Sequence, residues 1–231
     1  HREVKPALGC TEPVAVSLAV AKACSLFPGE IPSKIVVEVS ANILKNAMGV
    51  GIPGTGMVGL NIAVALAMVC GKAEYGLEVL KDLTPADVEK AKAYSATAGN
   101  VKIALAQTDK KLYIDAKAYF TDNNGEEHFG RTIIADDHDA IVFVAKDEEV
   151  ILDNRNDSSA QQETQTETKA TRTTLDYHLN MNKIYEFATT ADLKDISFIL
   201  EAATMNKALA VEGLAREYGL QVGRTIQANI H

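Results

Sequence analysis

The fold class follows from residues 111–134, which read KLYIDAKAYFTDNNGEEHFGRTII. Two segments rich in β-branched and aromatic residues flank Asn124-Gly125, a dipeptide that strongly favours a tight β-hairpin. Similar short segments lie on either side of this stretch, so the region predicts an antiparallel meander. The predicted strands are residues 101–106, 111–120, 128–134, 140–146 and 149–152.

The sequence before the meander is mainly helical in pattern. Thr11 is a candidate N-cap for a helix that has a proline in its first turn and a stop signal at Pro28-Gly29. Thr84 is a candidate N-cap for a later helix, with Pro85 as its first residue. The predicted elements are a helix at 13–27, a strand at 34–40, an apolar helix at 58–69 and a helix at 82–98.

The sequence after the meander is first polar and then helical. Residues 153–174 lack apolar anchors, which predicts a flexible linker or exposed loop. Residues 193–219 predict a helix with Gly219 as its C-cap. We therefore predict an α+β protein with N-terminal helices and a strand, an antiparallel β-meander, and then a linker and C-terminal helices. The predicted parts are an α+β domain at 1–152, the linker at 153–174 and a helical segment at 175–231.

The composition and charge of the chain exclude some classes of binding partner. The formal net charge is -8, and no basic run stands out, so we do not expect the chain to bind nucleic acid. The longest apolar stretch, residues 57–70, is shorter than the roughly 20 residues that span a bilayer, so we expect no membrane insertion. Cys10, Cys24 and Cys70 form an odd and widely spaced set, which indicates reduced thiols in a cytoplasmic protein.

The first candidate for chemistry is Cys10, in the run ALGCTEP at residues 7–13. A helix start favours a thiolate over a thiol, and a thiolate is what a nucleophile or an iron ligand requires. A single cysteine at a helix start is also consistent with an inert residue beside a cap. Cys24 would lie about 20 Å from Cys10 along the same helix, so the two cannot bind one cluster.

The second candidate is the run NILKNAMGVGIPGTGMVG at residues 42–59. Its glycines precede a helix and could present backbone N–H groups to a carboxylate or phosphate. Glycines that only allow tight helix packing are an equally good interpretation. The upstream Lys45 could hold a carboxylate or act as a base if it is desolvated, and an ordinary solvated lysine is the alternative.

Two motifs carry a resemblance to a known family. The runs EVKPALGCTEPVAVSLAVAKA (3–23) and SANILKNAMGVGIPGTGMVGLNIAVALAMVCG (40–71) resemble the L-cysteine desulfidase family, which is related to the iron–sulfur L-serine dehydratase alpha chain. The hairpin region and VEGLAREYGLQVGRTIQANI (211–230) are further similarities. The resemblance thus covers nearly the whole chain.

This resemblance implies a lyase with a [4Fe–4S] cluster held by three cysteines, which eliminates sulfide and ammonia from L-cysteine to give pyruvate. It implies that Cys10 is one cluster ligand and that the other two lie in a C-terminal helical domain missing from this chain. We therefore expect a fragment with no intact cluster, inactive alone, unless a homodimer supplies the extra cysteines. L-serine dehydratase activity and a non-catalytic small-anion-binding domain are the alternatives.

The resemblance also implies a site for the amino-acid substrate. We predict Lys45 as the catalytic base, with the substrate bound by residues of the second run: Asn42, Asn46, Gly54, Thr55 and Gly56. The sulfur of Cys10 should then face a cavity shared with part of the loop at 51–59, because a small substrate must reach both. With the partner domain absent, this cavity should be wide, open on one side and bordered by an apolar wall.

Overall fold

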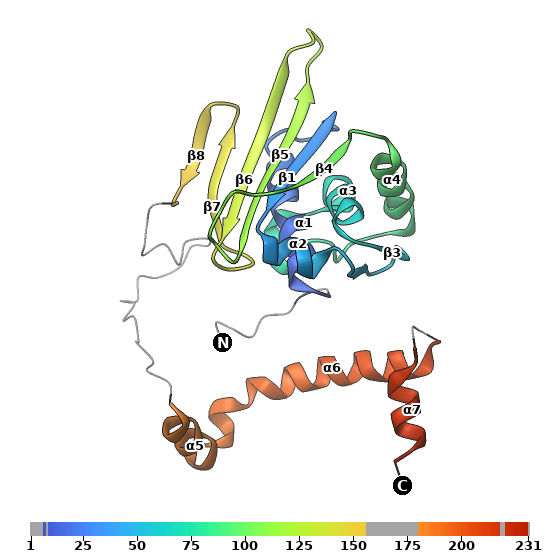
Figure 1. Ribbon diagram of the computed structural model, residues 1–231, viewed down its shortest axis with the longest axis vertical. Coiled ribbons are helices and arrows are strands. Elements are labelled where there is room, and N and C mark those ends of the chain that lie inside the picture. The colour runs from blue at the N-terminus through green and yellow to red at the C-terminus, as the bar shows by residue number, and fades with distance from the viewer. Residues whose placement is uncertain (1–6, 8, 156–179, 218–219, 231) are drawn as a thin grey trace. The chain divides into compact units, whose positions relative to one another are not determined.

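The computed structural model describes residues 7, 9–155, 180–217 and 220–230. These residues form two units, an N-terminal unit within residues 7–155 and a C-terminal unit within residues 180–230 (Figure 1). The elements of the N-terminal unit are α1 (Thr11–Cys24), β1 (Lys34–Val39), α2 (Ala41–Ala47), β2 (Gly51–Ile52), β3 (Met57–Val58), α3 (Leu60–Cys70), η1 (Ala73–Glu78), α4 (Pro85–Ala96), β4 (Val101–Leu105), β5 (Tyr113–Thr121), β6 (Glu127–Ala135), β7 (Ile141–Lys146) and β8 (Glu149–Asp153).

A mixed six-stranded sheet forms the centre of this unit, in the order β4-β1-β5-β6-β7-β8. Strands β5 to β8 are an antiparallel meander, and the hairpin at Asn124-Gly125 joins β5 to β6. The predicted α+β class is therefore confirmed. The prediction that residues 101–106 belong to the meander is wrong, because β1 lies between β4 and β5 and pairs in parallel with β4. The long helical connection between β1 and β4 makes that parallel pairing possible.

The helix α1 is the core element that covers this sheet. Ten of its 14 residues are buried, and it packs against β5, β6 and α3. Its first helical residue is Thr11 and its N-cap is Cys10, so the prediction of Thr11 as the cap is wrong. The helix ends at Cys24, three residues before the predicted end, and the residues up to Gly29 form turns.

The predicted start of α4 is confirmed. The hydroxyl of Thr84 accepts a hydrogen bond from the backbone N–H of Asp87, and the Asp87 carboxylate accepts one from the backbone N–H of Thr84. Pro85 is the first helical residue. This reciprocal capping box satisfies backbone donors that a helix start otherwise leaves without partners.

The C-terminal unit consists of helices: α5 (Met181–Thr190), η2 (Leu193–Ile196), α6 (Phe198–Ala215) and α7 (Val222–Ala228). The predicted helix at 193–219 corresponds to η2 and α6, while its predicted cap, Gly219, lies outside the described residues. Most of the predicted linker, residues 156–174, also lies outside them. None of the described helices combines the length and the apolar character needed to cross a membrane.

Replacing Gly130 by alanine should destabilise the N-terminal unit. Gly130 lies on β6, where an added Cβ would overlap the backbone carbonyl of Ala23 at the end of α1. Separating α1 from the sheet should lower the free energy of unfolding by about 1–3 kcal/mol. Gly49→Ala is the control, because a Cβ there meets nothing within 4 Å and should change stability by less than about 0.5 kcal/mol. Urea unfolding followed by circular dichroism measures both, and equal midpoints would contradict this packing.

Candidate functional site

The turn at Gly9 and Cys10 brings the start of α1 to the loop between β2 and β3. Gly9 has a φ of 91°, a left-handed conformation that glycine adopts without steric cost. A Cβ added at Gly9 would lie 3.5 Å from Cγ of Pro53 in that loop. Cys10 follows as the N-cap of α1 and is exposed, so its sulfur is not part of the aliphatic core.

Three side chains from two helices meet at this point. The thiol of Cys10 donates a hydrogen bond to Oε2 of Glu12 at 2.8 Å. The side-chain amide of Asn46, on α2, donates to Oε1 of the same carboxylate at 3.1 Å. The structure therefore brings together the predicted residues Cys10 and Asn46 through Glu12. The sequence prediction missed Glu12, although its place in the first turn after Cys10 was a usable signal.

The charge state of this group differs from the sequence prediction. Partial burial of the sulfur, and next its hydrogen bond to Glu12, raise the pKa of the Cys10 thiol above its usual value. The predicted thiolate at the helix start is therefore wrong for this conformation. The same hydrogen bond from Cys10 is the main cause that lowers the pKa of Glu12, with Asn46 also contributing. In this geometry the thiol of Cys10 is the hydrogen-bond donor and the carboxylate of Glu12 is the acceptor.

Cys10 also borders a small recess shared with the glycine-rich loop. The recess has a volume of about 10 Å³, enough for about one water molecule. The predicted sharing between Cys10 and the loop is confirmed, but the predicted wide cavity is wrong for the described residues. The lining residues are Cys10, Pro13, Val14, Ser17, Val50, Gly51, Ile52, Pro53 and Leu80.

A larger groove lies near the other end of the same loop. Its volume is about 240 Å³, and it contains none of the predicted site residues. Exposed Met48 and Val58 give it an apolar border of the kind predicted for an uncovered wall. The lining residues are Leu44, Met48, Val58, Gly59, Leu60, Asn61 and Ile103.

The glycine-rich run forms a short hairpin instead of an open cradle. The buried hydroxyl of Thr55 donates to the carbonyl of Ile52 at 2.7 Å and accepts from the N–H of Met57 at 2.9 Å. The N–H groups of Thr55 and Gly59 donate to backbone carbonyls in the same region. Thr55 therefore stabilises the turn and does not present its hydroxyl to a ligand. The exposed Gly54 and Gly56, with φ of 78° and 67°, supply the left-handed positions of that turn.

The other predicted residues of α2 point to water. The side chains of Lys45 and Asn42 are exposed and make no hydrogen bond to another described residue. An exposed lysine lacks the desolvated surroundings in which a lysine acts as a base. The role predicted for Lys45 therefore requires a segment that covers it, and it remains a prediction.

Cys24 and Cys70 do not join Cys10. Cys24 ends α1, about 21 Å from Cys10 at 1.5 Å per residue, and burial raises the pKa of its thiol to about 12. Burial likewise raises the pKa of Cys70 to about 11. The described residues thus provide one accessible thiol, which fits the role of a single cluster ligand. They do not provide the three or four ligands that an iron–sulfur cluster requires.

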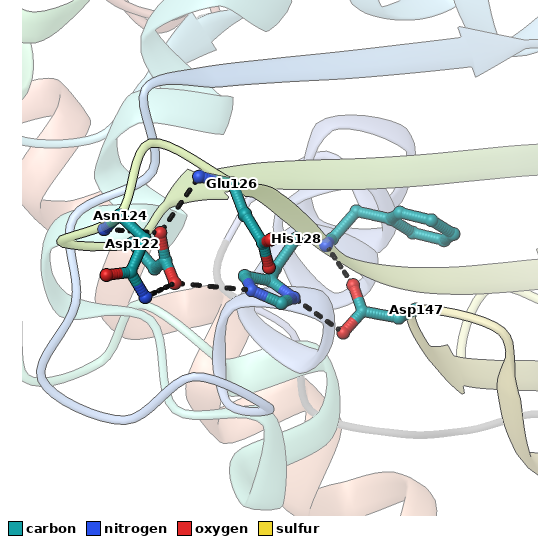
Figure 2. Close-up of polar contacts among 6 residues, drawn as sticks. Asp122, Asn124, Glu126, His128 and Asp147 are labelled. Carbon is teal, nitrogen blue, oxygen red and sulfur yellow. Dashed lines mark hydrogen bonds and ion pairs between the residues drawn. The ribbon is translucent and has the colours of Figure 1, made fainter.

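One other group of the described residues has the composition of a cation site. Ligand atoms of Asp122, Glu126 and His128 lie within 4.8 Å of one another at the hairpin between β5 and β6 (Figure 2). Asp122 also closes the hairpin, because its Oδ1 accepts the N–H groups of Asn124 and Glu126 at 2.8 Å each. Nδ1 of His128 lies 3.0 Å from Asp147 Oδ2, and this pair raises the pKa of His128. Polar contacts within the hairpin, and the contact to Asp147 in the turn between β7 and β8, account for the positions of these side chains. No predicted site residue belongs to the group.

Comparisons with known proteins place the chain beside relatives of twice its length. It is 44% identical over 230 residues to a UPF0597 protein of Oleidesulfovibrio alaskensis. It is 43% identical to one of Bacteroides thetaiotaomicron and 41% identical to one of Aeromonas hydrophila. These matches cover 98–100% of the chain and 49–50% of each relative, so the chain spans about half the length of the curated relatives it matches. No family model matches the chain.

Substituting Glu12 by glutamine should make Cys10 more reactive. The neutral amide would remove both the anionic acceptor and the repulsion that raise the pKa of the thiol, so the pKa should fall. Alkylation of Cys10 by iodoacetamide, followed by mass spectrometry against pH, should therefore shift to lower pH. Glu30→Gln is the control, since Glu30 lies in the turn after α1. An unchanged or higher alkylation midpoint in Glu12→Gln would contradict the hydrogen bond.

The pair of His128 and Asp147 should give a measurable dependence on pH. Since Asp147 raises the pKa of His128 above 6.5, the pair stabilises the folded protein fully below that pH. The stabilisation is lost as the pH rises through the raised pKa of the folded state. Asp147→Asn should therefore lower the pKa of His128 in an NMR titration of the imidazole signals. Asp137→Asn, in the turn between β6 and β7, is the control variant and should leave the pKa of His128 unchanged.

Proposed function

We propose that the protein to which this chain belongs is an iron–sulfur-dependent lyase acting on L-cysteine. Elimination would remove the Cα proton and the β-sulfur, giving aminoacrylate and sulfide, and hydrolysis would convert aminoacrylate to pyruvate and ammonia. Dehydration of L-serine is the rival activity, because a hydroxyl leaving group fits the same scheme. The observation that carries the proposal is an exposed Cys10 at the N-cap of α1, beside the glycine-rich loop.

The geometry supports a division of roles within this chain. Cys10 is the accessible thiol, and its loss of a proton would make it a ligand for iron. An open iron in such a cluster would act as a soft Lewis acid suited to a leaving sulfur. Glu12 acts as a positioning residue, since it holds the sulfur of Cys10 and is itself held by Asn46. The exposed Lys45 remains the predicted base.

The remaining ligands and the cover of the site come from outside this chain in this proposal. Cys24 and Cys70 are unsuited as ligands by distance and burial. The recess at Cys10 is too small for an amino acid, and one side of the loop has an apolar border. A small-anion-binding domain is less well supported, because three N–H groups of the loop already have partners within the hairpin region.

The full-length protein, reconstituted with iron and sulfide without oxygen, should release sulfide and pyruvate in equal amounts from L-cysteine. Cys10→Ser should abolish the activity and lower the bound iron, because one cluster ligand is lost. Cys24→Ala should keep both the activity and the bound iron. Glu12→Gln should lower the activity by about 10- to 100-fold, because Glu12 hydrogen-bonds to the proposed ligand Cys10. The 231-residue chain alone should bind less than a full cluster.

Two results would contradict the proposal. If neither L-cysteine nor L-serine is consumed by the iron-loaded protein, the lyase assignment is wrong. If Cys10→Ser keeps its iron and activity while Cys24→Ala loses them, the site has been placed at the wrong end of α1.

A further inference from the structure

The helices of the C-terminal unit expose apolar side chains along their whole length. Among the described residues of α5, α6 and α7, none is buried. Large apolar side chains that lie open to solvent include Tyr185, Phe187, Leu200, Leu209, Val222 and Ile226. Soluble monomers rarely expose contiguous apolar patches of this kind unless the patch serves an interaction.

The long helix α6 has exposed apolar side chains on more than one side, so a partner that buries them must contact the helix on more than one side. Leu200 and Leu209 are 69% and 71% exposed, and they are nine residues apart. At about 100° per residue they lie on opposite sides of the helix. A helix with large apolar side chains on opposite sides is normally packed against more than one element of a larger protein. A flat contact along one side of α6 would leave either Leu200 or Leu209 in water.

The charge of the C-terminal unit and the length of the relatives indicate what covers these helices. Residues 180–230 contain five basic and six acidic side chains, which differs from the lysine- and arginine-rich face of helices that lie on a membrane. No described helix could cross a membrane. The relatives contain, outside the matched region, about as many residues again as this chain contains. A segment of that size is large enough for a domain with its own core.

We propose that α5, α6 and α7 form one side of an intramolecular interface, and that the other side is the half of the full-length protein absent from this chain. The absent half surrounds α6 on more than one side and completes a helical domain with it. This interface stands independently of the lyase chemistry, because it rests on the apolar surface and on the length of the relatives.

Hydrogen exchange of the full-length protein and of the 231-residue chain, measured side by side, tests this interface. In the chain alone, the amides of α6 should exchange quickly, since most of the stability of a helix in a protein comes from tertiary packing. In the full-length protein they should exchange about 100-fold more slowly or slower still. The amides of α1 should be protected in both proteins and serve as the internal control.

A matched pair of variants separates burial from helix formation. Leu209→Asp should remove the protection of α6 in the full-length protein, because it places a charge in the interface. Ala208→Asp introduces the same charge within about 40° of Glu201 and Glu212, on the acidic side of α6, and should leave the protection in place. Slow exchange of α6 only in the full-length protein, with this difference between variants, supports the proposal.

Three results would overturn it. The first is equally fast exchange of α6 in both proteins. The second is protection of α6 in the 231-residue chain together with a dimeric mass by light scattering, which would make a second copy the occupant. The third is an equal effect of Leu209→Asp and Ala208→Asp on the full-length protein.

Discussion

Close packing of α1 is the constraint on which the N-terminal unit depends. The helix has apolar or small residues on nearly every side, and Ala15, Ala19 and Ala23 are fully buried. Side chains of this size let the helix approach both the sheet and α3 closely. The absence of a side chain at Gly130 is what admits the carbonyl of Ala23. The buried hydroxyl of Ser17 has a partner in the carbonyl of Ala63 at 3.1 Å, so this approach leaves it satisfied.

The placement of Cys10 follows from that packing. Because Pro13 and the residues after it are buried, the chain enters the core within one turn of Cys10, and the N-cap remains at the surface. The left-handed Gly9 lies close to Pro53, since a Cβ added at Gly9 would lie 3.5 Å from its Cγ. The hydrogen bond between Asn46 and Glu12 joins residues 34 positions apart. The same packing that stabilises the fold therefore assembles the Cys10, Glu12 and Asn46 group.

Local signals were readable from the sequence, and long-range pairings were not. Thr84 and Pro85 predicted the start of α4, and Asn124-Gly125 predicted the hairpin, because each motif satisfies its own backbone groups. The parallel pairing of β1 with β4 depends on contacts about 65 residues apart, such as Ile35 with Val101. No local pattern encodes it. The role of Thr55 was also missed, because glycine-rich anion cradles and glycine-rich hairpins have the same composition.

The two units differ in how much of their apolar surface is buried. The N-terminal unit has a continuous core of aliphatic side chains from α1, β1, α3 and β5, so most of its apolar groups have partners. The C-terminal unit has the composition of core helices, and none of the described residues in its α-helices is buried. The proposed site for a small amino acid would have to exclude water to strengthen its electrostatic contacts, whereas the recess at Cys10 has room for only about one water molecule. The helices of the C-terminal unit and the thiol of Cys10 are therefore two separate surfaces that lack a protein cover. The residues by which the relatives exceed this chain are numerous enough to cover both.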